Sequence, residues 1–303
     1  MKNKFTRFTN KNLLLNGIIT LAYLLWCHFG MQEIKSEHYI LVFIWLVSYY
    51  FDDKSRRFVK AFLFFIVFWI IYDSMRVVPN YTINTVHIQQ PYELEKWLFG
   101  ISDMGKILTP NEYFAQHSHQ ILDFLSGFFY INWMPIPLGF GVYLFTKDKA
   151  LFLQFSSAFL LVNILGFIIY YLYPAAPPWY VEKYGFDLQL GVPGSRAGLV
   201  RFDELIHYPL FQNIYNKNAN VLAAMPSLHA TYPLIVLFYS IKRRMNKKII
   251  GIFALFTVGI WFSAVYSSHH YIIDVLVGIF IALIVLLIFD KFLNKLSTFL
   301  RQV

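Results

Sequence analysis

The chain has 303 residues, of which 57% are hydrophobic, 20% aromatic and only 14% charged, with a formal net charge of +9. This balance excludes an ordinary soluble domain and indicates an integral membrane protein. The positive charge does not indicate a nucleic-acid partner, because Lys and Arg occur in short clusters between apolar runs rather than along one continuous basic segment. The only cysteine, Cys27, lies within the first apolar run, so an intrachain disulfide is excluded.

Apolar runs long enough to cross a bilayer alternate with short polar segments along the whole chain. They predict an all-α, polytopic bundle of about eight spans within a single membrane domain, 1–303. We divide this domain into N-terminal spans with an outer loop, 1–120, and a helical core, 121–303. Pro135 and Pro137 predict a kink in the fourth span. The predicted spans are 13–31, 37–51, 58–77, 121–146, 150–173, 222–241, 249–268 and 271–289.

The first span, 13–31, follows a basic N-terminus and lacks a cleavage signature of small residues, so we interpret it as a retained anchor. A cytoplasmic N-terminus fixes the side of every later loop. With that assignment, 18 of the 26 Lys and Arg residues fall inside, and 13 of the 17 acidic residues fall outside. The distribution follows the positive-inside rule and supports the topology.

Two long polar segments, 78–120 and 174–221, fall on the outer side in this topology. In the first, Leu94, Trp97, Leu98 and Ile101 recur at helical spacing. They lie beside the charged residues Glu93, Glu95 and Lys96. This pattern fits a short helix lying in the membrane interface, and it fits equally well an amphipathic helix packed on the bundle. Long outer segments of this kind are where functional residues are expected.

The ionisable residue that most needs an explanation is Asp274, because a charge at membrane depth is unfavourable without a partner. His270 precedes it by four residues, which would place both side chains on one face of the last helix. A carboxylate that accepts a hydrogen bond from one imidazole nitrogen fixes the tautomer and leaves the other nitrogen free as a nucleophile or base.

A second histidine, His229, follows Pro226 and Ser227, which signal the start of a helix. A helix N-terminus offers unpaired N–H groups and a partial positive charge to a phosphate. In the predicted topology His229 and His270 both lie at the outer ends of their spans, so we expect them to meet.

Less specific interpretations of these residues remain open. Each histidine considered alone fits a packing or hydrogen-bonding role. A metal site built from His229, His269, His270 and Asp274 is chemically reasonable, although neighbouring histidines point in different directions on a helix. His117 and His119 are interpreted as surface residues.

Several motifs resemble those of a known family. Pro-Ser-Leu-His at 226–229 and His-Tyr-Ile-Ile-Asp at 270–274 are similar to two of the three signature motifs of the type 2 phosphatidic acid phosphatase superfamily. Within it, the chain most resembles the inositol phosphorylceramide synthases, the fungal target of aureobasidin A. This closer resemblance covers roughly 150–290, with the motifs in the same order as in that family. It includes Ala-Ala-Pro-Pro-Trp-Tyr at 175–180, Ala-Gly-Leu-Val-Arg-Phe-Asp at 197–203 and the doubled His269-His270.

The resemblance implies a phosphatase-type helical core, with His270 as the nucleophile that attacks phosphorus, Asp274 as its orienting partner, and His229 as the acid for the leaving alkoxide. It also places Ser227, His269 and Trp179 among the substrate-binding residues. Arg201 and Arg76 are the outer cations available to bind phosphate, with a salt bridge to Asp203 as the alternative role for Arg201.

The chain also departs from the superfamily pattern. The first motif, a Lys followed by Arg-Pro, is absent, and Ala264 stands where an Arg is expected. Both normally neutralise a phosphomonoester, so their absence favours a phosphodiester substrate.

The resemblance therefore implies a transferase that moves a phosphoinositol or similar head group from a phospholipid donor to a ceramide-like lipid acceptor, with no cofactor, metal or nucleic acid. A phosphatase acting on phosphatidate or a polyprenyl diphosphate is the alternative, and a transporter with a His-Asp relay is a third class. We expect a bacterial inner-membrane location with the site facing the periplasm.

Overall fold

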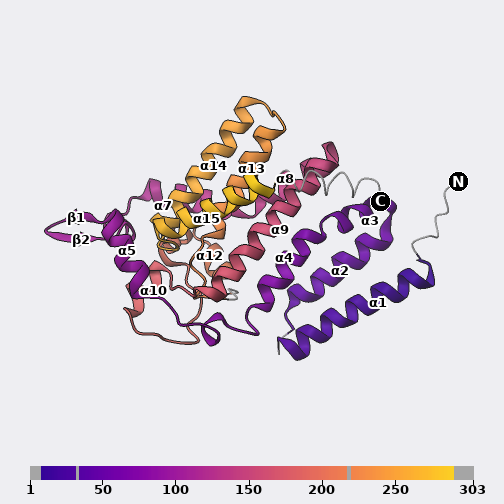
Figure 1. The fold of residues 1–303 in the computed structure, drawn as a ribbon, viewed down its shortest axis with the longest axis horizontal. Helices are drawn as coiled ribbons and strands as arrows, with labels where there is room; N and C mark the ends of the chain where they lie inside the picture. Colours follow the sequence, from indigo (N-terminus) through magenta and orange to yellow (C-terminus); the bar gives the residue numbers. More distant parts are fainter. Residues whose placement is uncertain (1–7, 32–33, 217–219, 290–303) are drawn as a thin grey trace. The chain divides into compact units, whose positions relative to one another are not determined.

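The structure, a computed structural model, describes residues 8–31, 34–216 and 220–289. It consists almost entirely of helices and divides into two compact units, Met1–Val78 and Pro79–Val303 (Figure 1). The predicted all-α class is confirmed for the described part of the chain, where the only sheet is a two-stranded hairpin.

The N-terminal unit is built from apolar helices joined by short turns. Asp52 caps the basic helix α3 by accepting a hydrogen bond from the Ser55 N–H group. Cys27 is a buried free cysteine. The helices are α1 (Asn10–Leu25), which continues into a π-helical turn (Trp26–Gly30), α2 (Ser36–Phe51), α3 (Asp53–Ala61) and α4 (Leu63–Ser74).

The C-terminal unit contains a bundle of longer helices. Helices α7 (Gln120–Tyr130) and α8 (Pro135–Lys147) form one broken element with a bend of 43°, which confirms the predicted kink at the prolines. The other long helices are α9 (Lys149–Leu172), α13 (Leu228–Lys242), α14 (Lys247–Tyr266) and α15 (Ile272–Ile284), the last continued by a π-helical turn, Val285–Phe289.

Helices α13 and α15, which carry the two sequence motifs, pack closely against each other. Gly278 of α15 makes this approach feasible, because a Cβ atom there would lie only 2.4 Å from the carbonyl oxygen of Ser227. The Ser227 N–H group in turn donates to the carbonyl of Asp274. The start of α13 is therefore fixed to the first turn of α15 through backbone groups.

The polar segments between the long helices fold into short elements next to the motif-bearing ends of α13 and α15. Three extended stretches, around His87, Ala175 and Ala223, run parallel and share backbone hydrogen bonds. The stretch around Ala223 leads the chain into the Met225-Pro226 cis peptide and then into α13. The short elements are α5 (Gln89–Phe99), β1 (Ile101–Asp103), β2 (Lys106–Leu108), α6 (Pro110–Gln116), α10 (Pro178–Tyr184), α11 (Val200–Leu205) and α12 (Leu210–Tyr215).

Among the described residues, three helices are individually long and apolar enough to cross a membrane: Asn10–Gly30, α9 and α14. The bent pair of α7 and α8 makes a fourth candidate, and α4 and Ile272–Ile288 are apolar but shorter. The chain is therefore a membrane-type helical protein, and the count of eight spans stays a prediction. The last residues of the predicted span 271–289 reach the limit of the described chain.

Candidate active site

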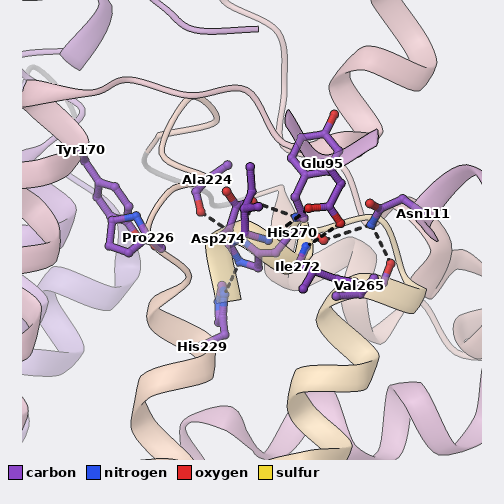
Figure 2. Close-up of polar contacts among 12 residues, drawn as sticks. Glu95, Asn111, Tyr170, Ala224, Pro226, His229, Val265, His270, Ile272 and Asp274 are labelled. Carbon is purple, nitrogen blue, oxygen red and sulfur yellow. Dashed lines mark hydrogen bonds and ion pairs between the residues drawn. The ribbon is translucent and has the colours of Figure 1, made fainter. Parts of the chain in front are cut away.

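The two histidines predicted to meet do so. His229 lies in the first turn of α13, whose N-cap is Ser227, as Pro226 and Ser227 predicted. Its Nδ1 atom is 3.0 Å from Nε2 of His270, although 41 residues separate them. Figure 2 shows the two rings facing each other across this contact.

His270 differs from the prediction in its location. It lies in the connection before α15, not on that helix, which begins at Ile272. Its Nδ1 atom lies 2.9 Å from the carbonyl oxygen of Ala224 and 3.7 Å from Oδ2 of Asp274. The carbonyl, an obligate acceptor, therefore fixes Nδ1 as the protonated nitrogen and leaves Nε2 with its lone pair directed at His229.

Burial lowers the pKa of His270 to about 4, and the hydrogen bond to the Ala224 carbonyl opposes this shift only in part. The ring is therefore neutral at physiological pH. A neutral imidazole with a free Nε2 lone pair is the form that can attack an electrophile.

Asp274 is fully buried and sits one turn into α15, as the last helix was predicted to carry it. Its Oδ2 atom accepts a hydrogen bond of 2.8 Å from the Tyr271 N–H group, which completes a capping box at the start of the helix. Its Oδ1 atom has no hydrogen-bond partner among the described residues. The carboxylate therefore interacts with the His270 ring electrostatically, at 3.7 Å, and it holds the backbone next to His270 through the Tyr271 N–H group.

Tyr130 is a member of the site that the sequence patterns did not reveal. It is completely buried, and its hydroxyl lies 3.2 Å from Nδ1 of His229. Its ring stacks on His269, and the ring of Tyr215 also stacks on His269. The rings of Trp133 and His229 pack edge to face, with 4.8 Å between their centroids. The sequence showed only that Tyr130 and Trp133 lie in an apolar run. Aromatic residues make up a fifth of the chain, so these two did not stand out.

The substrate-binding candidates around the histidines have distinct environments. Ser227 is fully buried, and its hydroxyl has no partner among the described residues. His269 contacts the Arg196 carbonyl at 3.2 Å through Nε2. The N–H group of Trp179, a buried residue of α10, donates to the Ser268 carbonyl. Ser227 is therefore the candidate with a free polar group, while His269 and Trp179 support the loop before α15.

Arg201 does not form the salt bridge with Asp203 that was its alternative role. Asp203 pairs with Arg196 at 3.0 Å. The Nε atom of Arg201 instead lies 2.5 Å from Asp123, and its guanidinium lies over the Tyr266 ring. Its Nη2 atom has no hydrogen-bond partner within the described part of the chain, so it retains one donor for a ligand.

Arg76, the other predicted cation, belongs to the N-terminal unit, where it pairs with Asp73 at 2.5 Å. Asp73 also accepts from His38 at 2.8 Å. Arg76 thus contributes to an ion-pair cluster inside its own unit. The exposed His117 lies 3.7 Å from Asp103, and His119 caps the start of α7.

Over residues 8–31, 34–216 and 220–289, no group of three or more His, Cys, Asp or Glu side chains is arranged to hold a metal ion. The imidazoles of His229 and His270 instead lie at hydrogen-bond distance from each other, and the Ala224 carbonyl accepts from the other nitrogen of His270. Such an arrangement can attack a phosphorus centre and protonate the group that leaves it.

Residues 106–288, which include both motifs, match the PAP2 superfamily. The chain belongs to this superfamily. It is similar to the phosphoinositol dihydroceramide synthase of Bacteroides thetaiotaomicron, with 43% identity over 291 residues that cover 96% of this chain and 95% of the relative. This similarity confirms the resemblance that the motifs suggested.

Fungal proteins are more distant relatives. The inositol phosphorylceramide synthase catalytic subunit of Schizosaccharomyces pombe is 26% identical over 226 residues, which cover 72% of this chain and 51% of the relative. That of Saccharomyces cerevisiae is 31% identical over 121 residues, or 39% of this chain and 29% of the relative. No solved structure matches the chain. The predicted enzyme class, a phosphotransferase of the PAP2 superfamily, agrees with these relatives.

Proposed function

We propose that this protein transfers a phosphoinositol group from a phosphatidylinositol-type phospholipid to ceramide or dihydroceramide. The similarity to the Bacteroides synthase over nearly the whole chain supports the choice of substrates. The observation that carries the chemistry is the buried His270, whose Nε2 atom lies 3.0 Å from the Nδ1 atom of His229. The two rings form a nucleophile and proton-donor pair for one phosphorus atom placed between them.

In the first step the phosphodiester replaces the hydrogen bond between the two imidazoles. Nε2 of His270 forms a bond to phosphorus while the bond from phosphorus to the diacylglycerol oxygen breaks. His229, whose protonated form the bound anion favours, gives its proton to that oxygen. The products are diacylglycerol and a phosphohistidine diester on His270.

In the second step the primary hydroxyl of ceramide attacks phosphorus and the bond to His270 breaks. His229, now neutral, accepts the hydroxyl proton, which restores the starting state of both rings. The carbonyl of Ala224 holds Nδ1 of His270 throughout. The negative charge of Asp274, 3.7 Å away, stabilises the positive ring that forms when Nε2 is phosphorylated.

The charges around the site favour a phosphodiester over a phosphomonoester. Ala264 is completely buried, and its carbonyl accepts from the N–H groups of His269 and His270. Arg201 and Arg196, which flank the same loop, are each paired with a carboxylate. This supply of positive charge suits a phosphate group with one negative charge better than one with two.

A product assay on the purified protein tests this proposal. The protein in detergent is given phosphatidylinositol, labelled in the inositol ring, together with ceramide or dihydroceramide. We expect a labelled inositol phosphorylceramide and one equivalent of diacylglycerol. Release of free inositol phosphate without a labelled sphingolipid would indicate a hydrolase and overturn the transferase assignment.

We further propose that the chain crosses the bacterial inner membrane eight times, with both termini in the cytoplasm and the site facing the periplasm. The inside location of 18 of 26 cationic residues supports this topology. Met104, at the turn between β1 and β2, is 96% exposed and offers a reporter position on the outer side.

The topology test uses Met104→Cys in a Cys27→Ser background. We expect a membrane-impermeant thiol reagent that reaches the periplasm to label this cysteine in intact cells. The Cys27→Ser parent is the unlabelled control. Labelling only after the cytoplasmic membrane is broken would place the loop, and the site with it, on the cytoplasmic side.

A further inference from the structure

Helix α5 has an inverted distribution of polar and apolar residues. Leu94, Trp97 and Leu98 are exposed by 45%, 79% and 47%, whereas Glu95, in the middle of the same helix, is completely buried. The exposed apolar residues fit a helix at a membrane interface. A carboxylate removed from solvent is unfavourable unless hydrogen bonds replace its hydration, so the position of Glu95 needs a structural reason.

That reason is the start of α15. Oε1 of Glu95 accepts a hydrogen bond of 2.9 Å from the Ile272 N–H group, and Oε2 accepts one of 3.1 Å from the Ile273 N–H group. The Tyr271 N–H group just before them donates to Asp274. Three successive N–H groups at this helix start are therefore taken by two carboxylates, one of them supplied from 177 residues earlier in the chain.

The same outer segment holds the connection before α15 at a second point. Asn111, in the first turn of α6, is completely buried. Its Nδ2 atom donates to the carbonyls of both Val265 and His270, at 2.8 and 3.0 Å. Figure 2 shows Glu95 and Asn111 approaching this connection from the side opposite His229. Together they fix both backbone ends of the loop that carries the nucleophile.

We propose that Glu95 is a positioning residue for the phosphoryl-transfer site, which sets the place of His270 by holding the start of α15; this inference rests on the proposed function. His270 and Asp274 lie two residues before and two after Ile272. A shift of this helix start therefore moves both side chains relative to Ala224 and His229, which belong to a different segment. Small displacements of this kind slow a reaction that depends on a near-attack geometry.

The charge state of Glu95 matters to this role. Burial raises the pKa of Glu95 to about 7, the charge of Asp274 adds to the rise, and the two backbone N–H groups oppose it. Tyr271 also interacts electrostatically with Glu95. An ionised carboxylate accepts both hydrogen bonds, whereas a protonated one loses acceptor strength at one oxygen. Positioning is therefore complete above this pKa and weakens as the pH falls through it.

The test compares Glu95→Gln with Glu93→Gln, a matched change at an exposed position of the same helix. The amide keeps the size of the side chain but directs an NH₂ group at one of the two N–H donors. We expect kcat to fall at least tenfold in Glu95→Gln with little change in KM and in thermal midpoint. We also expect the wild type to lose activity below about pH 7, and we expect this acidic limb to be absent from the profile of Glu95→Gln.

Glu95→Asp is the second variant, because it keeps the negative charge but shortens the reach. We expect a lowered kcat with the pH limb retained, which a purely structural residue would not produce. Diacylglycerol release is measured with both phosphatidylinositol and phosphatidate as donors. The ratio of the kcat of each variant to the kcat of Glu93→Gln is then obtained with whichever donor the wild type cleaves. A wild type that cleaves only phosphatidate would refute the proposed function and leave this ratio measurable.

The positioning role would be refuted by a kcat of Glu95→Gln within twofold of the Glu93→Gln control. It would equally be refuted by an unchanged acidic limb in Glu95→Gln, since Glu95 would then not be the group that titrates.

Discussion

The two histidines sit beside two helix starts that are built in opposite ways. At the start of α15, carboxylates from Glu95 and Asp274 accept the first three N–H groups. At the start of α13, the N-cap Ser227 makes no side-chain capping bond, and its buried hydroxyl is unpartnered among the described residues. One helix start is therefore already occupied by anions of the protein itself, and the other can accept an anion from outside.

This difference suits the two helix starts to different roles in the proposed mechanism. A phosphate at α15 would meet two carboxylates, whereas a phosphate at α13 would meet N–H groups, a hydroxyl and His229. In the proposed mechanism the carboxylates also keep negative charge beside His270, the ring that becomes positive when it attacks phosphorus. In the proposed mechanism, therefore, the start of α13 binds the phosphate and the start of α15 activates the nucleophile.

The largest effect is expected for His270→Ala. Removal of the nucleophile should lower phosphoinositol transfer on the order of 10⁴-fold and abolish the covalent phosphohistidine, since members of such a catalytic group act as a unit. His117→Ala, a change at an exposed histidine, is the control and should transfer at the wild-type rate. Incubation with labelled donor, followed by alkaline gel electrophoresis, measures the intermediate. A labelled His270→Ala protein would mean that another residue is the nucleophile.

A smaller effect is expected for Asp274→Asn. The amide oxygen can still accept from Tyr271, so the helix start should persist, but the negative charge next to His270 is lost. We expect kcat to fall about 10- to 100-fold, the equivalent of a charge-assisted hydrogen bond, with an unchanged thermal midpoint. Asp187→Asn, at an exposed position, is the control. A lowered midpoint with normal activity per folded molecule would instead identify Asp274 as a purely structural group.

The parts of this site that follow one segment of chain were readable from the sequence. Ser227 and Pro226 marked the start of α13, and the spacing of His270 and Asp274 marked their proximity. The sequence could not reveal the Ala224 carbonyl as the partner of His270, because that contact depends on the parallel extended stretches at 87, 175 and 223. A backbone acceptor carries no residue-type signal at all.

Glu95 was misleading for a related reason. Its neighbours Glu93 and Lys96 made it look like one member of a polar helix face, and a sequence pattern does not distinguish a solvated carboxylate from one that caps another helix. Helix lengths were also overestimated. The predicted run 222–241 includes residues that belong to the extended entry into α13, because the Ala-rich apolar stretch before Pro226 pairs with Ala175 instead of continuing the helix.

The smallest effect, and the most direct test of an open start at α13, is expected for Ser227→Ala. In the free protein the Ser227 hydroxyl is buried and makes no hydrogen bond to a described residue. The substitution therefore breaks no such bond and removes an unsatisfied polar group, so the thermal midpoint should stay constant or rise slightly. In the complex the hydroxyl would donate to a phosphate oxygen. Its loss should lower kcat/KM about tenfold, the lower end of the range for a hydrogen bond to a charged group. Ser126→Ala, another buried serine with an unpartnered hydroxyl, is the matched control and should leave kcat/KM unchanged. A Ser227→Ala protein with the kcat/KM of that control would show that phosphate does not bind at α13, and the two helix starts would then differ in structure without differing in task.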